Sequence, residues 1–384
     1  MILHNKCIWI ISPQDWGVMR ISKHHYAVSL ARRGNKVYFF EPPVFRGWFG
    51  YRKPVIRPSD TDSSLYIVSC SLRLPYFFYF HFRSFFNFFI IKEIRSLALF
   101  LGCTPDIIWS FDLSELFPLR YFSNVPLRIF HPVDMPWSPS FMSAAKGADI
   151  LFSTSSDILN KYADLPISSV FIEHGVSEDF LNDMMDFNPE REVLRVGYSG
   201  NLLRHDIDRD IFLRIVKENS SVIFECWGSY GQGDGNLGGV KDAAGAAFIS
   251  DLKACSNVIL HGAVSPAKLA RAMAQMDAFL ICYDLSAPNV IGPNYHKLME
   301  FFSTGKVIIS TFIKHYIDRP DLIQMVSQDG NNDLPALFRA VISKINDHNR
   351  LELMTIRKDW ARSNSYCKQI DRIDIQLASL NKIS

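Results

Sequence analysis

Short strand-like runs alternate with helical patterns along most of this sequence, and that alternation restricts the fold more than any other feature. In the first half, the strand candidates are residues 8–12, 36–40, 65–69, 107–111, 128–131, 150–153 and 169–173. In the second half, they are residues 194–199, 222–227, 257–262, 278–283 and 306–310. Strands that alternate with helices form parallel sheets covered on both faces, so we expect an α/β fold.

The alternation is interrupted at residues 182–192, which are polar, contain a proline and follow no strong period. A chain of 384 residues is long enough for two domains, and a polar segment of this kind is typical of a linker. We therefore expect two Rossmann-like domains, residues 1–181 and 193–355, that face each other across a cleft. Helices within residues 356–384 are expected to pack back on the first domain.

Charge and cysteine content exclude several classes of protein. The formal net charge of +2 is smaller than the basic excess usual in nucleic-acid-binding proteins. The seven cysteines form no CxxC pair, so we expect reduced, mostly buried thiols and no zinc site. The N-terminus lacks the apolar region of a signal peptide, and no apolar stretch reaches the roughly 18 residues of a spanning helix. We expect a cytoplasmic protein.

Residues 76–91 read YFFYFHFRSFFNFFII, an unusual density of aromatic side chains. As a helix, this segment would gather Arg83, Ser84 and Asn87 on one side and leave a wide aromatic face. Two interpretations stay open: a buried core helix, or a helix that lies in a membrane interface against anionic headgroups. The preceding residues 46–57 mix basic and aromatic residues in the same way, which favours the membrane somewhat more.

Loops that follow strands are where we expect ligands, because open parallel sheets bind them at the carboxyl ends of strands. In residues 13–17, Gly17 would allow close approach of a ligand, but the GxGxxG fingerprint of dinucleotide binding is absent. In residues 197–209, Gly200 and Asn201 follow a strand. Arg204 and Arg209 in that segment are suited to clamping a diphosphate. Ordinary loops with solvated arginines are the alternative.

The segment PNYHKLMEFFSTGKVIIS, residues 293–310, carries the most specific pattern. Lys297 and Glu300 share one helix face, and Asn294 and His296 stand just before them. A lysine at the positive end of a helix suits phosphates, and a carboxylate one turn later suits the hydroxyl groups of a ribose. A surface ion pair between the two is the alternative.

These segments resemble glycosyltransferases of the GT-B fold, especially those similar to family 4 of bacterial cell-surface polysaccharide synthesis. The strongest match is residues 293–310, with their Pro, Lys and Glu followed by a glycine turn and a strand. NVILHGAVSPAKLARAMAQMDAFLICY at residues 257–283, IEHGVSEDF at 172–180 and SKHHYAVSLARRGNKVYFFEPP at 22–43 resemble other parts of the group. The resemblance covers nearly the whole chain.

The resemblance implies transfer of a sugar from a nucleotide diphosphate, UDP favoured, to a lipid-linked or glycan acceptor, with no cofactor and no metal. The first domain would be the acceptor side, and the second would bind the donor. Glu300 would hold the ribose, Lys297 would lie near the diphosphate, and Arg204 and Arg209 match the group's basic pair in spacing. Many relatives have a further glutamate where this sequence has Gly292, so the usual retaining outcome is left open.

The other candidates also lie near strand ends. Tyr283 closes the strand before the 293–310 segment and joins the donor-binding set. His131, Asp134 and His174 are candidates for orienting or deprotonating the acceptor, although a single histidine at a strand end is more often structural than catalytic. The expected partners are a nucleotide sugar, a polyprenyl-linked or glycan acceptor, and a membrane surface through residues 76–91, without nucleic acid.

Other functions remain open at this stage. A nucleotide-sugar epimerase has the same architecture, and Gly292 is compatible with a partner that binds a nucleotide sugar without turnover. A dehydrogenase is disfavoured by the missing GxGxxG pattern.

Overall fold

The computed structural model describes residues 2–47, 50, 52–136, 142–182, 192–231, 243–286, 295–328 and 330–380. Its contacts divide the chain into two compact units. The first consists of Met1–Trp16, Ile21–Glu173 and Gln369–Ser384, and the second of Gly17–Arg20 and His174–Lys368. The division falls between Glu173 and His174, whereas most of the expected linker, residues 183–191, lies outside the described residues.

The first unit is built on an eight-stranded sheet with the order β10-β9-β8-β7-β1-β2-β5-β4. Its strands are β1 (Cys7–Ile11), β2 (Lys36–Phe40), β4 (Val55–Pro58), β5 (Leu65–Ser69), β7 (Ile107–Ser110), β8 (Leu127–Phe130), β9 (Ile150–Ser153) and β10 (Ser168–Phe171). All neighbours pair in parallel except β4, which runs antiparallel to β5. Strands β3 (Val44–Phe45) and β6 (Ser71–Leu72) pair separately.

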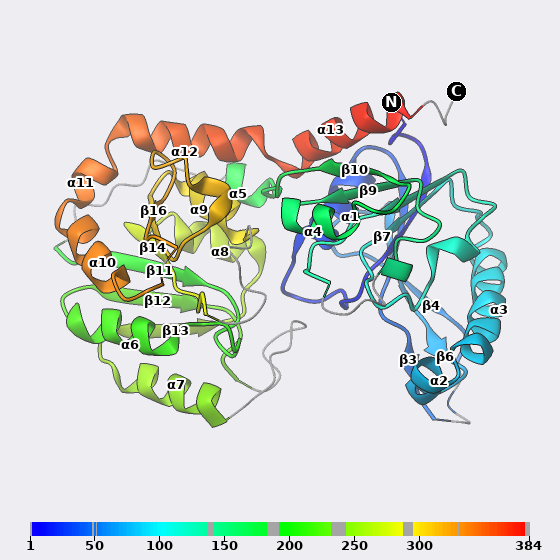
Figure 1. The fold of residues 1–384 in the computed structure, drawn as a ribbon, viewed down its shortest axis with the longest axis horizontal. Helices are drawn as coiled ribbons and strands as arrows, with labels where there is room; N and C mark the ends of the chain where they lie inside the picture. Colours follow the sequence, from blue (N-terminus) through cyan, green and yellow to red (C-terminus); the bar gives the residue numbers. More distant parts are fainter. Residues whose placement is uncertain are drawn as a thin grey trace. The chain divides into compact units, whose positions relative to one another are not determined.

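Helices of the first unit cover this sheet. They are α1 (Ser22–Arg32), α2 (Tyr76–His81), α3 (Arg83–Leu101), α4 (Ser156–Lys161) and the 3-10 turn η1 (Leu119–Tyr121). Figure 1 shows α2 and α3 in the same part of this unit as β3 and β6. The aromatic segment is thus two helices that break at Phe82, whose φ is −137° and ψ is 56°. No helix in the described part of the chain combines the length and apolarity needed to cross a membrane.

Cys7 and Cys103 form a disulfide, which corrects the expectation that every cysteine is reduced. Cys7 starts β1, and Cys103 follows the end of α3 and shortly precedes β7. Because β1 and β7 are parallel neighbours, their amino ends lie at one edge of the sheet. Because 96 residues separate the two cysteines, no local sequence pattern indicates that they pair. Cys70, Cys226 and Cys282 are buried thiols, as expected.

The second unit has a six-stranded parallel sheet with the order β13-β12-β11-β14-β15-β16. Its strands are β11 (Arg195–Ser199), β12 (Ile223–Trp227), β13 (Val258–Gly262), β14 (Ala278–Ile281), β15 (Val307–Ser310) and β16 (Gln324–Met325). Figure 1 shows α6 (Arg209–Glu218) and α7 (Ala243–Ala254) on one face of this sheet. On the other face lie α8 (Pro266–Met273) and α9 (Lys297–Thr304). The buried strand side chains form one hydrophobic core.

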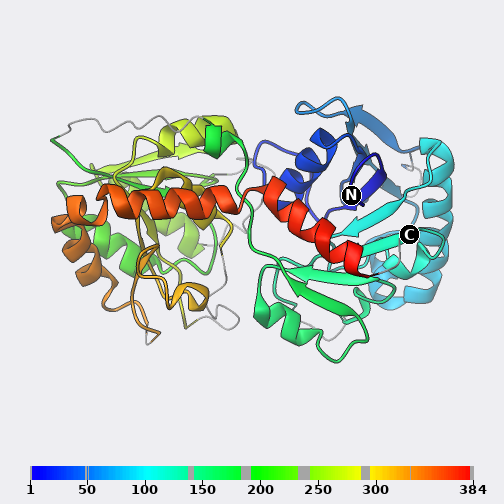
Figure 2. The ribbon, with the colours of Figure 1, turned by 90° about the horizontal axis from the view of Figure 1, so that it is seen from above.

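The remaining helices lie towards the C-terminal end, apart from the short α5 (Asp179–Asn182). They are η3 (Lys314–Tyr316), α10 (Leu334–Ser343), α11 (Ile345–His348), α12 (Leu351–Ser363) and α13 (Tyr366–Ser379). From Gln369 onward, α13 belongs to the first unit, and Figure 2 shows it beside the N-terminus. Asp374 accepts the backbone amide of Leu3 at 2.8 Å, and Arg33 pairs with Asp371 at 2.6 Å.

Candidate functional site

The second sheet reverses the direction of its strand order at its central strands. Strand β11 has β12 on one side and β14 on the other, so the crossovers leave it in opposite directions. Loops separate at such a switch point and leave space for a ligand at the carboxyl edge of the sheet. Gly200 directly follows β11, and Tyr283 follows the end of β14. The candidate donor residues therefore lie where open α/β sheets bind ligands.

Two glycines allow the ends of β11 and β12 to come together. The Gly200 amide donates to the Trp227 carbonyl at 2.9 Å. A Cβ on Gly228, whose φ is +127°, would lie 2.0 Å from the Gly200 carbonyl oxygen, which is fixed backbone. A Cβ on Gly200 would lie 2.3 Å from Lys297 Nζ. Gly200 is therefore needed because Lys297 lies where a side chain would be. The sequence did not indicate that Gly228 is needed as well.

Lys297 is the first residue of α9 and is buried. Its Nζ donates a hydrogen bond to the Tyr283 hydroxyl at 2.8 Å and lies 5.4 Å from the centre of the Tyr198 ring. Among the described residues, the ammonium forms no ion pair with a carboxylate. A buried cation at the positive end of a helix, held by a neutral hydroxyl, is ready to receive an anion. Lys297 and Glu300 therefore do not form the surface ion pair that was the alternative interpretation.

Glu300 lies one turn further along α9 and is also buried. Burial raises the pKa of its carboxyl from 4.5 to about 8, and the charge of Lys297 opposes part of that rise. Its side-chain oxygens accept no hydrogen bond from any described residue. A buried carboxyl without donors has unused acceptor capacity, which the hydroxyl groups of a ligand can satisfy.

Arg204 and Arg209 are joined through the loop after β11. Arg204 Nε donates to Asp206 Oδ1 at 2.7 Å, and this hydrogen bond raises the pKa of the guanidinium. The Arg204 guanidinium also lies 5.7 Å from the centre of the Tyr283 ring. Arg209 donates to the Arg204 carbonyl at 3.1 Å and begins α6. The structure thus places Arg204 beside Tyr283, the residue that accepts from Lys297. Arg209 is connected to this group through the Arg204 carbonyl.

Asn201 and Tyr283 shape the loops around this group. The Asn201 side-chain oxygen accepts the Leu203 amide at 2.9 Å, which stabilises the turn after Gly200. The Tyr283 ring stacks on Tyr295 with centres 4.5 Å apart. Tyr198 and Tyr295 were missed because the position of a tyrosine in the sequence does not show which way its ring points.

His174 and His296 lie together in the second unit, with ring centres 6.3 Å apart. His296 directly precedes α9, so His174 lies near the start of that helix, in the second unit. Gly17 also groups with this unit. Asn294 and Gly292 lie outside the described residues.

The acceptor candidates of the first unit differ in exposure. His131 follows β8, and its ring is fully buried and packs on both Trp109 and Phe111, with its centre 4.9 Å from that of Phe111. Trp109 Nε1 donates to His131 Nδ1 at 3.3 Å. Asp134 lies a few residues further along and is exposed. Of the two, Asp134 is the one in a position to meet an acceptor from solvent.

Lys23 is an additional buried cation that the sequence analysis did not single out. It lies in the first turn of α1 with no exposed surface, and its Nζ donates to the Gln14 side-chain oxygen. Burial lowers the pKa of Lys23 to about 8, although Asp134 and Asp112 oppose the shift. Lys23 and Asp112 belong to the segments after β1 and β7, the switch point of the first sheet. The sequence pattern of α1 did not show that Lys23 lies on the buried face of the helix.

The chain superposes on solved glycosyltransferases over nearly its whole length. A glycosyltransferase from Rickettsia africae ESF-5 gives a TM-score of 0.68 at 12% identity, with 99% of this chain and 100% of that chain covered. Alr3699/HepE from Anabaena, in complex with UDP and glucose, gives 0.68 at 12% identity over 98% and 100%. Sucrose-phosphate synthase from Thermosynechococcus elongatus gives 0.66 at 11% identity over 97% and 99%. The chain has the GT-B fold.

The α/β fold class expected from the sequence is thereby confirmed. No protein-family model and no curated protein matches the sequence. Identity near 12% shows a shared fold and no more, so the resemblance to family 4 of the GT-B enzymes stays a prediction.

Proposed function

We propose that this GT-B chain is a glycosyltransferase that moves a sugar from a nucleotide diphosphate to a lipid-linked or glycan acceptor. UDP-sugars are the favoured donors, and bacterial surface polysaccharide synthesis is the favoured setting. The observation that carries the proposal is the arrangement on α9 at the sheet switch point. There, among the described residues, Lys297 is a buried ammonium without a carboxylate partner, and Glu300 is a buried carboxyl that accepts no hydrogen bond.

A nucleoside diphosphate complements both groups. The negatively charged diphosphate pairs with the ammonium of Lys297. It also accepts hydrogen bonds from the backbone amides at the start of α9. The ribose supplies hydroxyl donors for Glu300. Preference for UDP is supported by the similar fold of Alr3699/HepE, whose structure is in complex with UDP and glucose.

In the transfer step, the bond between the anomeric carbon and the diphosphate oxygen breaks, and a bond to the acceptor hydroxyl oxygen forms. Negative charge develops on the departing diphosphate, so fixed cations near it lower the barrier. Lys297 and Arg204 are assigned this role. The proton of the acceptor hydroxyl passes to a base, for which Asp134, His131 and His174 are the candidates.

Donor binding is the first test. Thermal shift with UDP, GDP, dTDP and CMP should show a rise in melting temperature that is largest for UDP, because a ligand bound to the folded state stabilises it. A folded sample that none of these stabilises, alone or as nucleotide sugars, would remove the basis of the proposal.

Product analysis then separates the candidate activities. A transferase gives free UDP and a glycosylated product when polyprenyl-linked acceptors are added. An epimerase changes the donor sugar without an acceptor, and a non-catalytic binder leaves the nucleotide sugar intact under both conditions.

A further inference from the structure

Exposed phenylalanine is concentrated in a single place in the described chain. Every exposed phenylalanine belongs to residues 76–101, the segment of α2 and α3. The exposed fractions are 56% for Phe77, 73% for Phe80, 55% for Phe82, 50% for Phe85, 51% for Phe88 and 45% for Phe100. Single exposed apolar residues are ordinary on protein surfaces, but a cluster of this size marks an interaction site.

Four of the exposed rings, those of Phe77, Phe82, Phe85 and Phe88, are linked through the half-buried Phe78 and Phe89. Phe82 contacts both Phe77 and Phe78, with ring centres 6.1 and 5.9 Å away. Phe78 in turn contacts Phe85, with ring centres 5.8 Å apart. Phe89 then connects Phe85 at 5.2 Å with Phe88 at 5.5 Å. We call the exposed phenylalanines of residues 77–88 the aromatic face.

Basic side chains continue the aromatic face along α3. Lys92 and Arg95 are exposed on the helical stripe that includes Phe88, and Lys92 Nζ lies 4.3 Å from the centre of the Phe88 ring. The one acidic residue of residues 76–101 is Glu93, which is buried and pairs with Arg73 at 3.4 Å. The outward surface of these helices therefore carries positive charge and no carboxylate.

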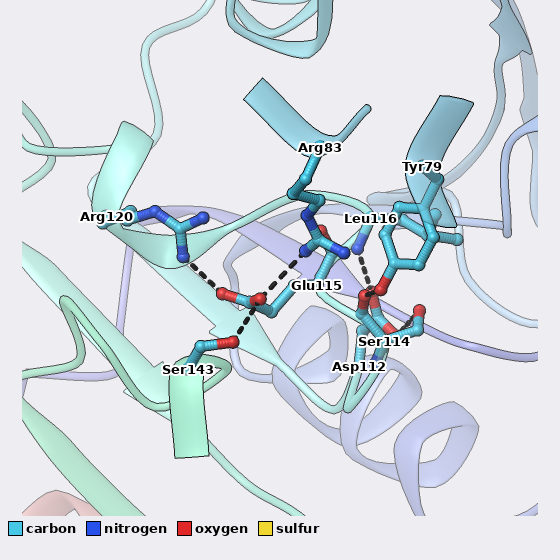
Figure 3. Close-up of polar contacts among 8 residues, drawn as sticks. All are labelled: Tyr79, Arg83, Asp112, Ser114, Glu115, Leu116, Arg120 and Ser143. Atoms are coloured by element: carbon cyan, nitrogen blue, oxygen red, sulfur yellow. Dashed lines mark hydrogen bonds and ion pairs between the residues drawn. The ribbon is translucent and has the colours of Figure 1, made fainter. Parts of the chain in front are cut away.

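The inner side of the helices is anchored to the loop after β7, as Figure 3 shows. Tyr79 donates its hydroxyl hydrogen to the Ser114 carbonyl, and Arg83 pairs with Glu115 at 2.9 Å. Glu115 is buried and also accepts from Arg120 and, at 2.5 Å, from Ser143. These contacts turn the Tyr79 hydroxyl and the Arg83 guanidinium towards that loop, while Phe80, Phe85 and Phe88 stay exposed.

We propose that the aromatic face, with Lys92 and Arg95, docks on the surface of an anionic lipid bilayer. Aromatic rings favour the headgroup level of a membrane, and basic side chains beside them are attracted to anionic lipids. A second copy of this chain fits less well, because two copies packed face to face would bring Lys92 and Arg95 of one copy close to the like-charged Lys92 and Arg95 of the other. This docking is independent of the donor site and would place the chain where a lipid-linked acceptor is found.

Vesicle sedimentation with the full-length protein tests the proposal. Wild-type protein should bind vesicles of phosphatidylcholine and phosphatidylglycerol more tightly than vesicles of phosphatidylcholine alone. The triple variant Phe80→Ser, Phe85→Ser and Phe88→Ser should bind the anionic vesicles about tenfold more weakly or worse, since it removes three exposed apolar groups. The pair Lys92→Glu and Arg95→Glu should lose the preference for phosphatidylglycerol.

Matched variants control for general surface effects. Val193→Ser, Leu351→Ser and Ile375→Ser replace exposed apolar residues elsewhere, and Lys161→Glu with Lys217→Glu makes the same change of charge elsewhere. Both control sets should bind vesicles as the wild type does. Melting temperature and UDP binding should remain unchanged in every variant, so a failure of membrane docking and a failure of donor binding are read out separately.

Three outcomes would overturn the proposal. The first is wild-type protein that does not sediment with anionic vesicles. The second is a folded triple variant, or a folded charge-reversal pair, that binds them as tightly as the wild type. The third is sedimentation velocity showing that the aromatic face controls self-association while vesicles do not bind, which would make a second copy the occupant.

Discussion

Lys297 Nζ donates a hydrogen bond of 2.8 Å to the hydroxyl of Tyr283, and within the described part of the chain this neutral partner leaves the lysine charge uncompensated. The two residues come from different elements, the start of α9 and the segment after β14. Tyr283 therefore fixes the direction of the ammonium without neutralising it.

Replacing Lys297 with methionine should weaken UDP binding by about 10- to 100-fold, because a charge-assisted hydrogen bond contributes about 1.5–3 kcal/mol. Calorimetric titration measures the change. Lys306→Met is the control, since Lys306 is equally buried and follows Gly305 beyond the other end of α9. Equal losses in the two variants would contradict a specific role for Lys297.

Glu300→Gln should make stability less dependent on pH. Because the pKa of Glu300 is raised to about 8 in the folded state, that state binds a proton more tightly than the unfolded chain does between pH 4.5 and about 8. The contribution of Glu300 to stability is therefore present at low pH and is lost as the pH rises through this window. The loss is about 1.4 kcal/mol per pH unit at most.

Urea unfolding of wild type and Glu300→Gln between about pH 5 and pH 8 measures this difference. The variant should gain on the wild type as the pH rises. Parallel stability curves would show that Glu300 does not titrate in this range.

Gly228→Ala should destabilise the protein by about 3 kcal/mol or more, for two reasons. The added Cβ meets the Gly200 carbonyl, and the backbone has a positive φ, which alanine rarely adopts. Gly330→Ala separates the two causes. Gly330 has a similar φ of +123°, but nothing lies within 4 Å of the added Cβ. We expect a cost of about 1 kcal/mol for that control in thermal unfolding. Similar costs would mean that the close approach of Gly200 and Gly228 is unimportant.

His131 and Asp134 should separate into a structural and a functional candidate. His131→Ala removes a buried ring packed on Trp109 and Phe111, and we expect a loss of about 2–4 kcal/mol in stability. Asp134→Ala, at an exposed position, should change stability by less than about 0.5 kcal/mol and reduce transfer to the acceptor. Full activity of a folded Asp134→Ala variant would exclude that residue as the base.

Much of the fold could be predicted from the sequence because apolar strands of a parallel sheet are buried on both faces. Every expected strand is present, with ends shifted by at most two residues. Strand β4 was missed because it is an exposed edge strand that ends in Pro58, and it gives neither a buried run nor clean alternation. The Cys7–Cys103 pair was missed because it depends on which strands become neighbours.

The candidate site was less predictable than the fold. Spacing along α9 indicated Lys297 and Glu300 as neighbours, and their shared helix turn agrees with this. Their burial, and the absence of an ion pair between them, depend on β11 and β14 packing beside α9 and could not be read from spacing. Phe86 and Asn87 show the same limit on α3, because both are buried although the sequence placed Asn87 on a polar side.

Apart from Gly17–Arg20, the second unit is one uninterrupted run of chain from His174 to Lys368. It contains every strand of its own sheet, so that sheet borrows no hydrogen-bonding partner from elsewhere. Such a run is suited to being exchanged as a module between proteins of this architecture. Recombination near the two ends of this run would then exchange the whole second sheet and leave the strands of the first sheet in place.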